Sequence, residues 1–67
     1  MQDKEQIIIQ ATVSRTIEVN KQWYKFEYSE KRVVRKINAK EERKKLWQQC
    51  IDEVEEQIEN LKKDLGL

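Results

Sequence analysis

Hydrophobic and polar residues alternate along the first third of the chain. Between residues 7 and 19 the odd positions are mostly apolar and the even positions mostly polar, and many of the apolar residues are β-branched. A period of two with this composition is typical of a strand that buries one face. We therefore predict a strand over about residues 6–19, with Arg15 as the charged exception on its apolar face.

A second strand is predicted over about residues 22–35. If Asn20 and Lys21 form a two-residue turn, opposed residues have numbers that sum to 41. That register sets the alternating aromatic residues of the second strand, Tyr24, Phe26 and Tyr28, on the apolar face. A shift by one residue would move them to the polar face, so the pattern favours this hairpin.

A long helix is predicted over about residues 39–64, where the chain has neither glycine nor proline. Asn38 followed by Glu41 three residues later is the pattern of a capping box at a helix start. Gly66 is a suitable residue for the helix end. The fold class is therefore α+β, a single β-β-α domain over residues 1–67.

The predicted helix carries six apolar residues spaced four, three, four, three and four apart, as in the a and d positions of a heptad repeat. A stripe this narrow favours contact with a second helix over burial in a globular core. We predict that the six form an oligomer interface, while Leu46, Cys50 and Gln57 beside them pack on the hairpin. The interface residues are Trp47, Ile51, Val54, Ile58, Leu61 and Leu65. The alternative is a monomer whose stripe packs wholly on the hairpin.

The size of the chain supports self-association. A chain of 67 residues buries only about 60% of its unfolded surface, and an isolated hairpin is marginal. With one cysteine and no histidine, neither an internal disulfide nor a structural zinc site can stabilise it. We therefore expect a homodimer or higher oligomer, joined through the helix, the sheet edge or both, and no cofactor.

Charge is divided unevenly along a chain that is nearly neutral overall, with 14 basic and 13 acidic residues. Residues 31–45 hold eight basic and two acidic residues, whereas residues 46–67 hold two basic and six acidic ones. An antiparallel helix pair would lay the first block beside the second, which favours that direction without deciding it. Basic residues in the first helical turns oppose the helix dipole, so a phosphate-binding surface is the functional alternative.

Contact with a partner protein or a nucleic acid is predicted for two groups of residues. Trp23 and Lys25 lie on the polar face of the hairpin, and Arg15 lies among apolar neighbours, where a charge is unexpected. The basic block supplies the remaining candidates, which are Lys31, Arg32, Arg35, Lys36, Lys40, Arg43 and Lys44.

Catalysis and membrane insertion have little support in the sequence. Histidine is absent, no glycine-rich loop is present, and Cys50 stands in mid-helix, where a thiol usually acts as a small hydrophobic side chain. There is neither an apolar run long enough to span a membrane nor a signal-peptide pattern. We expect a cytoplasmic protein without enzymatic activity.

The segment ATVSRTIEVNKQWYKFEY, residues 11–28, resembles the opening of small uncharacterised phage and prophage proteins. Those proteins carry Val-Ser-Arg-Thr-Ile in the first strand, matched here by residues 13–17, and then a turn and an aromatic second strand; this chain lacks their glycine at the turn. The resemblance implies a mobile-element accessory protein in the host cytoplasm. We expect a homo-oligomeric interaction protein that binds a host or phage protein. The alternative is a nucleic-acid-binding accessory protein that uses the Lys31–Lys45 run.

Overall fold

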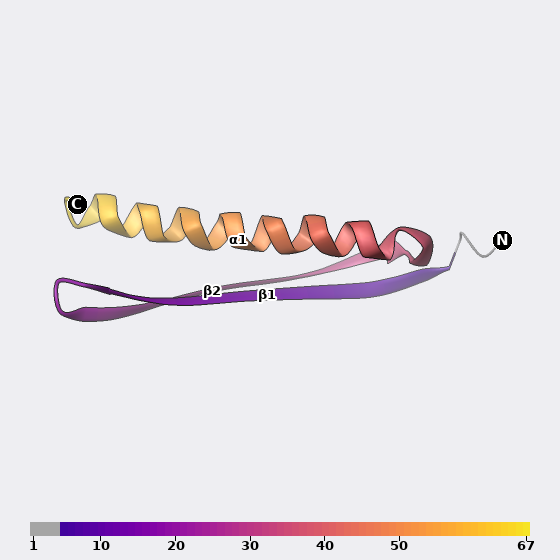
Figure 1. The fold of residues 1–67 in the computed structure, drawn as a ribbon, viewed down its shortest axis with the longest axis horizontal. Helices are drawn as coiled ribbons and strands as arrows, with labels where there is room; N and C mark the ends of the chain where they lie inside the picture. Colours follow the sequence, from indigo (N-terminus) through magenta and orange to yellow (C-terminus); the bar gives the residue numbers. More distant parts are fainter. Residues whose placement is uncertain (1–4) are drawn as a thin grey trace.

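The computed structural model describes residues 5–67 and contains a β-hairpin followed by one long helix. In chain order the elements are β1 (Gln6–Val19), β2 (Gln22–Arg35), the 3₁₀ turn η2 (Lys36–Asn38) and α1 (Ala39–Asp64). α1 lies along one face of the hairpin and ends beside the hairpin turn (Figure 1). The predicted β-β-α fold of the α+β class is confirmed.

The register of the hairpin is the predicted one. The two antiparallel strands pair from Gln6 opposite Arg35 to Val19 opposite Gln22. At the turn, Asn20 and Lys21 have φ angles of 52° and 65°. Positive φ at both central residues defines a type I′ turn, whose twist matches that of the flanking strands. The turn therefore fixes the register in which the apolar residues of both strands share the buried face.

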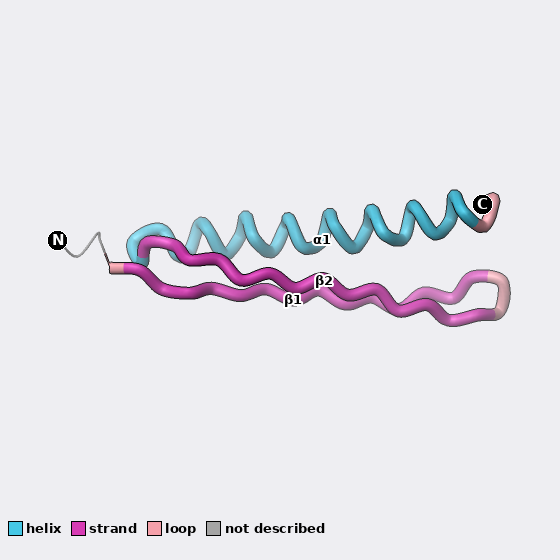
Figure 2. The backbone as a smooth tube through the Cα atoms, turned by 180° about the vertical axis from the view of Figure 1, so that it is seen from behind, coloured by secondary structure: helices cyan, strands magenta, loops and turns pink. Residues whose placement is uncertain are grey.

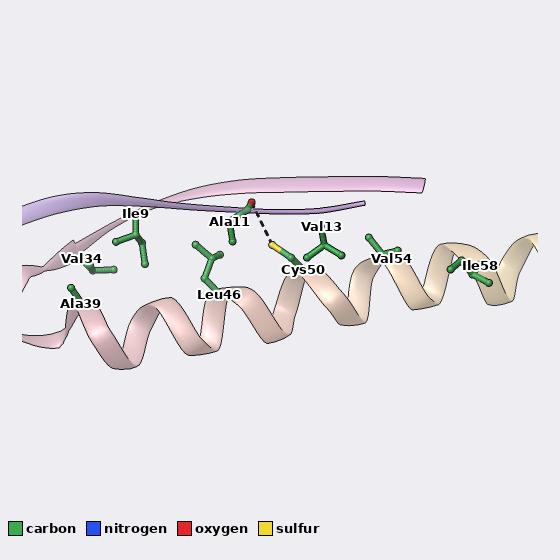
Figure 3. Packing of buried hydrophobic residues seen from close by; sticks show 9 residues of the cluster. All are labelled: Ile9, Ala11, Val13, Val34, Ala39, Leu46, Cys50, Val54 and Ile58. Atoms are coloured by element: carbon green, nitrogen blue, oxygen red, sulfur yellow. Dashed lines mark hydrogen bonds between the residues drawn. The ribbon is translucent and has the colours of Figure 1, made fainter. Parts of the chain in front are cut away.

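The core lies between α1 and the hairpin (Figure 3). On the helix a row of residues spaced four apart is buried, consisting of Leu46, Cys50, Val54 and Ile58. Such a row runs obliquely to the helix axis and can follow a sheet that twists. It packs on residues of both strands and of the helix start, namely Ile9, Ala11, Val13, Val34 and Ala39.

The heptad stripe is divided between the core and the surface. Val54 and Ile58 are 0% and 7% exposed against the hairpin, so their assignment to an interface between helices is corrected. They follow the four-residue row because the hairpin twists beneath the helix. Ile51 and Leu61 are half-buried, while Trp47 and Leu65 are exposed. For these four residues an interface role stays a prediction.

The helix start differs from the prediction. Asn38 has φ −100° and ψ 2° and makes no side-chain capping hydrogen bond, so the capping box expected with Glu41 is wrong. Instead, the Ala39 amide donates to the Lys36 carbonyl in the 3₁₀ turn. The turn satisfies an amide at the helix start that a capping side chain would otherwise have bonded.

The helix end agrees with the prediction. Gly66 has φ 77°, its amide donates to the Lys63 carbonyl at 3.0 Å, and the Leu67 amide donates to the Lys62 carbonyl at 2.8 Å. These two bonds form a Schellman motif, in which glycine adopts the left-handed conformation with little strain.

The described part of the chain is elongated, with extents of 56 × 16 × 13 Å. Its radius of gyration is 16.2 Å, whereas a compact domain of this length has about 11 Å. α1 covers one face of the two-stranded sheet, and no described element covers the other (Figure 2). None of the described residues forms a helix long and apolar enough to cross a membrane. The core is therefore a single thin layer.

Lys21→Gly should stabilise the fold by about 1 kcal/mol, because glycine adopts the left-handed conformation without the steric cost that lysine carries. Urea unfolding measures the change. Lys25→Gly is the matched control, since Lys25 is an exposed residue inside β2, where glycine costs about 0.5–1 kcal/mol. Equal changes in the free energy of unfolding for the two substitutions would contradict backbone strain at Lys21.

Candidate interaction surfaces

A polar network closes the side of α1 that faces β2. Arg32 Nη2 donates to Glu30 Oε2 at 2.9 Å and to Gln49 Oε1 at 2.6 Å. Arg32 Nη1 lies 3.7 Å from Glu42 Oε2, and Tyr28 Oη donates to Glu30 Oε1 at 2.9 Å. These contacts join β2 to α1 and leave their polar groups paired with one another. We call this side the β2 flank.

The network favours the ionised form of Glu30. The hydrogen bond from Tyr28, followed by that from Arg32, lowers the pKa of the Glu30 carboxyl from its ordinary value of 4.5. The same bond to Glu30, followed by burial, raises the pKa of the Tyr28 hydroxyl. Since Glu30 and Arg32 keep about a quarter to a third of their side-chain surface exposed, solvent weakens the ion pair. The network mainly orients these side chains.

The opposite side of α1, above β1, is open, and we call it the β1 flank. It contains a groove of about 330 Å³ lined by Gln10, Ala11, Arg43, Lys44, Leu46 and Trp47. Trp47 is 51% exposed and forms part of this groove. A large aromatic side chain beside an apolar groove is a common anchor in protein interfaces.

Nearer the hairpin turn, acidic side chains line a second groove on α1, which includes Arg15 of β1. It has a volume of about 480 Å³ and is lined by Arg15, Asp52, Glu55, Glu56, Ile58, Glu59 and Lys62. Arg15 is exposed and forms no ion pair with another described residue. Its neighbours would repel phosphate, so the structure separates Arg15 from the basic block.

The uncovered face of the sheet carries an apolar pair. Ile8 and Val33 lie directly opposite each other and are 69% and 60% exposed. Ile37 follows at the same end of the hairpin and is 71% exposed. Gln10 and Lys31 come next along this face, and beyond them the Thr12 and Ser29 hydroxyls are hydrogen-bonded at 3.0 Å. The predicted contact set omitted the apolar pair, although the register alone places its two residues together.

The basic block gathers at the open end of the hairpin and the start of α1. Arg32 is held in the polar network, and Lys36 Nζ lies 3.7 Å from Glu5 Oε2. Five other basic residues of the predicted contact set are exposed there and form no ion pair with a described residue; these are Lys31, Arg35, Lys40, Arg43 and Lys44. Trp23 lies next to the turn, at the other end of the hairpin, with Lys25 close by. The structure therefore does not bring Trp23 and Lys25 together with the basic block.

The cysteine belongs to the core. Cys50 is fully buried, and its Sγ lies 3.8 Å from the Ala11 carbonyl oxygen. Burial raises the pKa of the thiol, which keeps it protonated and poorly nucleophilic. The described residues contain no group of three potential metal ligands among His, Cys, Asp and Glu.

Tyr28→Phe should make the free energy of unfolding fall less steeply as the pH is lowered. Because the folded-state pKa of Glu30 lies below 4.5, the stability it contributes is complete above that pH and is lost as the pH falls through the folded-state value. Removing the Tyr28 hydroxyl should bring the folded-state pKa of Glu30 closer to the unfolded-state pKa of Glu30. Urea unfolding at a series of acidic pH values measures the slope of the free energy of unfolding against pH.

Tyr24→Phe is the matched control for this experiment. The Tyr24 hydroxyl donates to the neutral Gln22 amide oxygen at 2.8 Å and has no carboxylate partner among residues 5–67. Its removal should leave the acid slope of the wild-type protein unchanged. A Tyr28→Phe curve parallel to that of wild type would contradict the coupling between Tyr28 and Glu30.

The three surfaces differ in chemistry: the β1 flank is apolar with basic and acidic ends, the outer sheet face carries the apolar pair, and the open end is basic. Each consists of side chains placed by the hairpin register and by the helix row, and none surrounds the buried thiol. No protein-family model, no curated protein and no solved structure matches the chain.

Proposed function

We propose that this protein is a small, non-enzymatic interaction protein that associates with itself and binds a partner protein. The observation that carries the proposal is the exposed Ile8–Val33 pair on a sheet face that no described element covers. Apolar surface rimmed by polar residues is typical of protein interaction sites. Full burial of one such side chain stabilises a complex by about 1.5–3 kcal/mol.

The polar surroundings of the pair suit a protein partner. Gln10 Nε2 donates to Ser29 Oγ at 3.2 Å, and the Thr12 hydroxyl completes this small network. Because these side chains already bond one another, fewer of their polar atoms would be left unpaired at an interface, where unpaired groups are costly. The pair with its hydrogen-bonded neighbours therefore resembles the apolar centre and polar rim of an interface.

Self-association is supported by the thin core. A helix on a two-stranded sheet leaves large parts of both elements exposed, and the β1 flank offers apolar surface with Trp47. A second copy would cover such surface, and small chains commonly gain stability in this way.

The cellular context of the proposal comes from the Val-Ser-Arg-Thr-Ile strand. Its resemblance to phage and prophage proteins favours an accessory protein of a mobile element that acts in the host cytoplasm. The partner would then be a host or phage protein.

Substitution of the apolar pair should weaken partner binding. We expect immobilised wild-type protein to retain a specific protein from a bacterial host lysate, and Ile8→Ser with Val33→Ser to weaken that binding at least tenfold. Both side chains are exposed, so the fold should persist, and circular dichroism checks this. Mass spectrometry of the retained proteins, followed by titration of the purified partner, gives the measurement.

Ser14→Ala with Glu27→Ala is the control for the pair substitution. These two residues also lie opposite each other on the outer face, nearer the turn. The control should bind the partner as the wild-type protein does. Equal binding by the Ile8 and Val33 variant, or no protein retained at all, would refute this face as the partner site.

Nucleic-acid binding is the second candidate, favoured by the five exposed basic residues at the open end. If they contact phosphate, affinity for a short DNA duplex falls steeply as salt rises, and Arg35→Glu with Lys40→Glu and Arg43→Glu abolishes binding. Lys62→Glu with Lys63→Glu, near the other end of α1, is the control, and it reverses two charges where the test variant reverses three. Fluorescence anisotropy at two salt concentrations measures binding. On the leading proposal, the wild-type protein does not bind DNA at physiological salt.

A further inference from the structure

The outer edge of β1 presents unpaired backbone groups. Val19 and Gln22 flank the two-residue turn and form a hydrogen-bonded pair, and such pairs alternate along an antiparallel ladder. The odd-numbered residues of β1 therefore bond to β2, while the amides and carbonyls of even-numbered residues point outwards. Gln10, Thr12 and Ser14 stand at the middle of this free edge, which no described strand covers. On the outer edge of β2 the odd-numbered residues, such as Glu27 and Ser29, point their amides and carbonyls outwards.

The two edges differ in the helix flank that lies above them. Above β2, the polar network of Arg32 with Glu30, Glu42 and Gln49 closes the flank. Above β1, the groove with Trp47 is open. The β1 side thus combines a free strand edge with an apolar helix surface, and the β2 side does not.

We propose that a second copy of this chain docks on the β1 edge and forms a four-stranded antiparallel sheet in the order β2-β1-β1-β2. Both helices then lie side by side on one face of that sheet, running antiparallel. The proposal rests on the self-association in the proposed function and specifies the surface, the edge and the orientation.

The spacing of the elements fits this assembly. α1 packs on residues of both strands, so its axis lies over the middle of the hairpin. Strands in a sheet are about 4.8 Å apart, so a two-fold axis at the β1 edge places the two helix axes about 10 Å apart. Packed helices are separated by about 8–10 Å. The helices therefore come into contact as soon as the strands pair.

The charges fit an antiparallel pair as well. Cys50 contacts Ala11, so the middle of α1 is level with the middle of β1, and an axis near Thr12 passes near Ile51. This axis brings the apolar groove of one copy, with Lys44 and Trp47 in its lining, beside the acidic groove of the other copy, with Glu55 and Glu59. Opposite charges meet at both ends of the interface while Trp47 and Ile51 fill its centre.

Pairing through the β2 edge lacks this complementarity. On the β2 flank of α1, Glu42 is paired with both Arg32 and Lys45. A second helix on this flank would meet side chains that are already paired within one copy, and not an open groove. It would also require the Arg32 network to rearrange, so the β1 edge is the favoured one.

A pair of cysteine variants distinguishes the two edges. Thr12 and Ser29 are direct cross-strand neighbours, one on each edge of the hairpin. With a short bismaleimide reagent, Thr12→Cys should give a covalent dimer and Ser29→Cys should not. The buried Cys50 gives no background, which the wild-type protein checks. Efficient cross-linking of Ser29→Cys instead would overturn the β1 edge while leaving self-association intact.

Amide hydrogen exchange tests the same assembly without substitution. In the proposed dimer the amides of Gln10, Thr12 and Ser14 are bonded to the other copy and should exchange at least tenfold more slowly than those of Glu27 and Ser29. Equal, fast exchange at both edges would refute the proposal. A monomer in sedimentation would overturn the dimer and the self-association, whereas partner capture through the Ile8–Val33 pair is measured separately.

Discussion

The contact between one oblique row of α1 and the apolar face of the hairpin is the interaction on which the structure depends. Leu46, Cys50 and Val54 are almost fully buried in it, and the described part of the chain contains no other layer that supports either element. Truncating a buried leucine to alanine typically costs about 2–5 kcal/mol, and small domains have about 5–15 kcal/mol in total. Because the core is thin, one such substitution would remove a large share of the folding free energy. A second chain that covers more of the apolar surface would therefore stabilise the fold.

The position of this row also gives the two sides of the helix different chemistry. One flank comes to lie over Glu30 and Arg32 and closes through hydrogen bonds with Gln49. The other is left with Trp47 above a free strand edge. The two strand edges are equivalent, but the two flanks of α1 carry different side chains. One side of the molecule is therefore closed and the other is open. The candidate interaction surfaces follow from this asymmetry rather than from any buried reactive group.

Most of the fold could be predicted from local patterns. Alternation in β1 and β2, the Asn20–Lys21 turn and a helix without glycine or proline all point to the same hairpin and helix. The candidate interaction site was harder to predict from the sequence. The Ile8–Val33 pair follows from the register, but its exposure depends on which face the helix covers. The failed capping box at Asn38 has a similar origin, because η2 sets the backbone at the helix start.

By itself, the sequence determined the elements, the register and the helix end, because period-two alternation, turn chemistry and glycine at Gly66 act between residues close along the chain or directly paired. Only the tertiary structure decided which helix residues are buried. A heptad spacing and a four-residue row overlap at Val54 and Ile58, and the twist of the hairpin selects the row. That choice leaves Trp47 on the surface, because the direction of a helix face depends on the shape of the sheet beneath it.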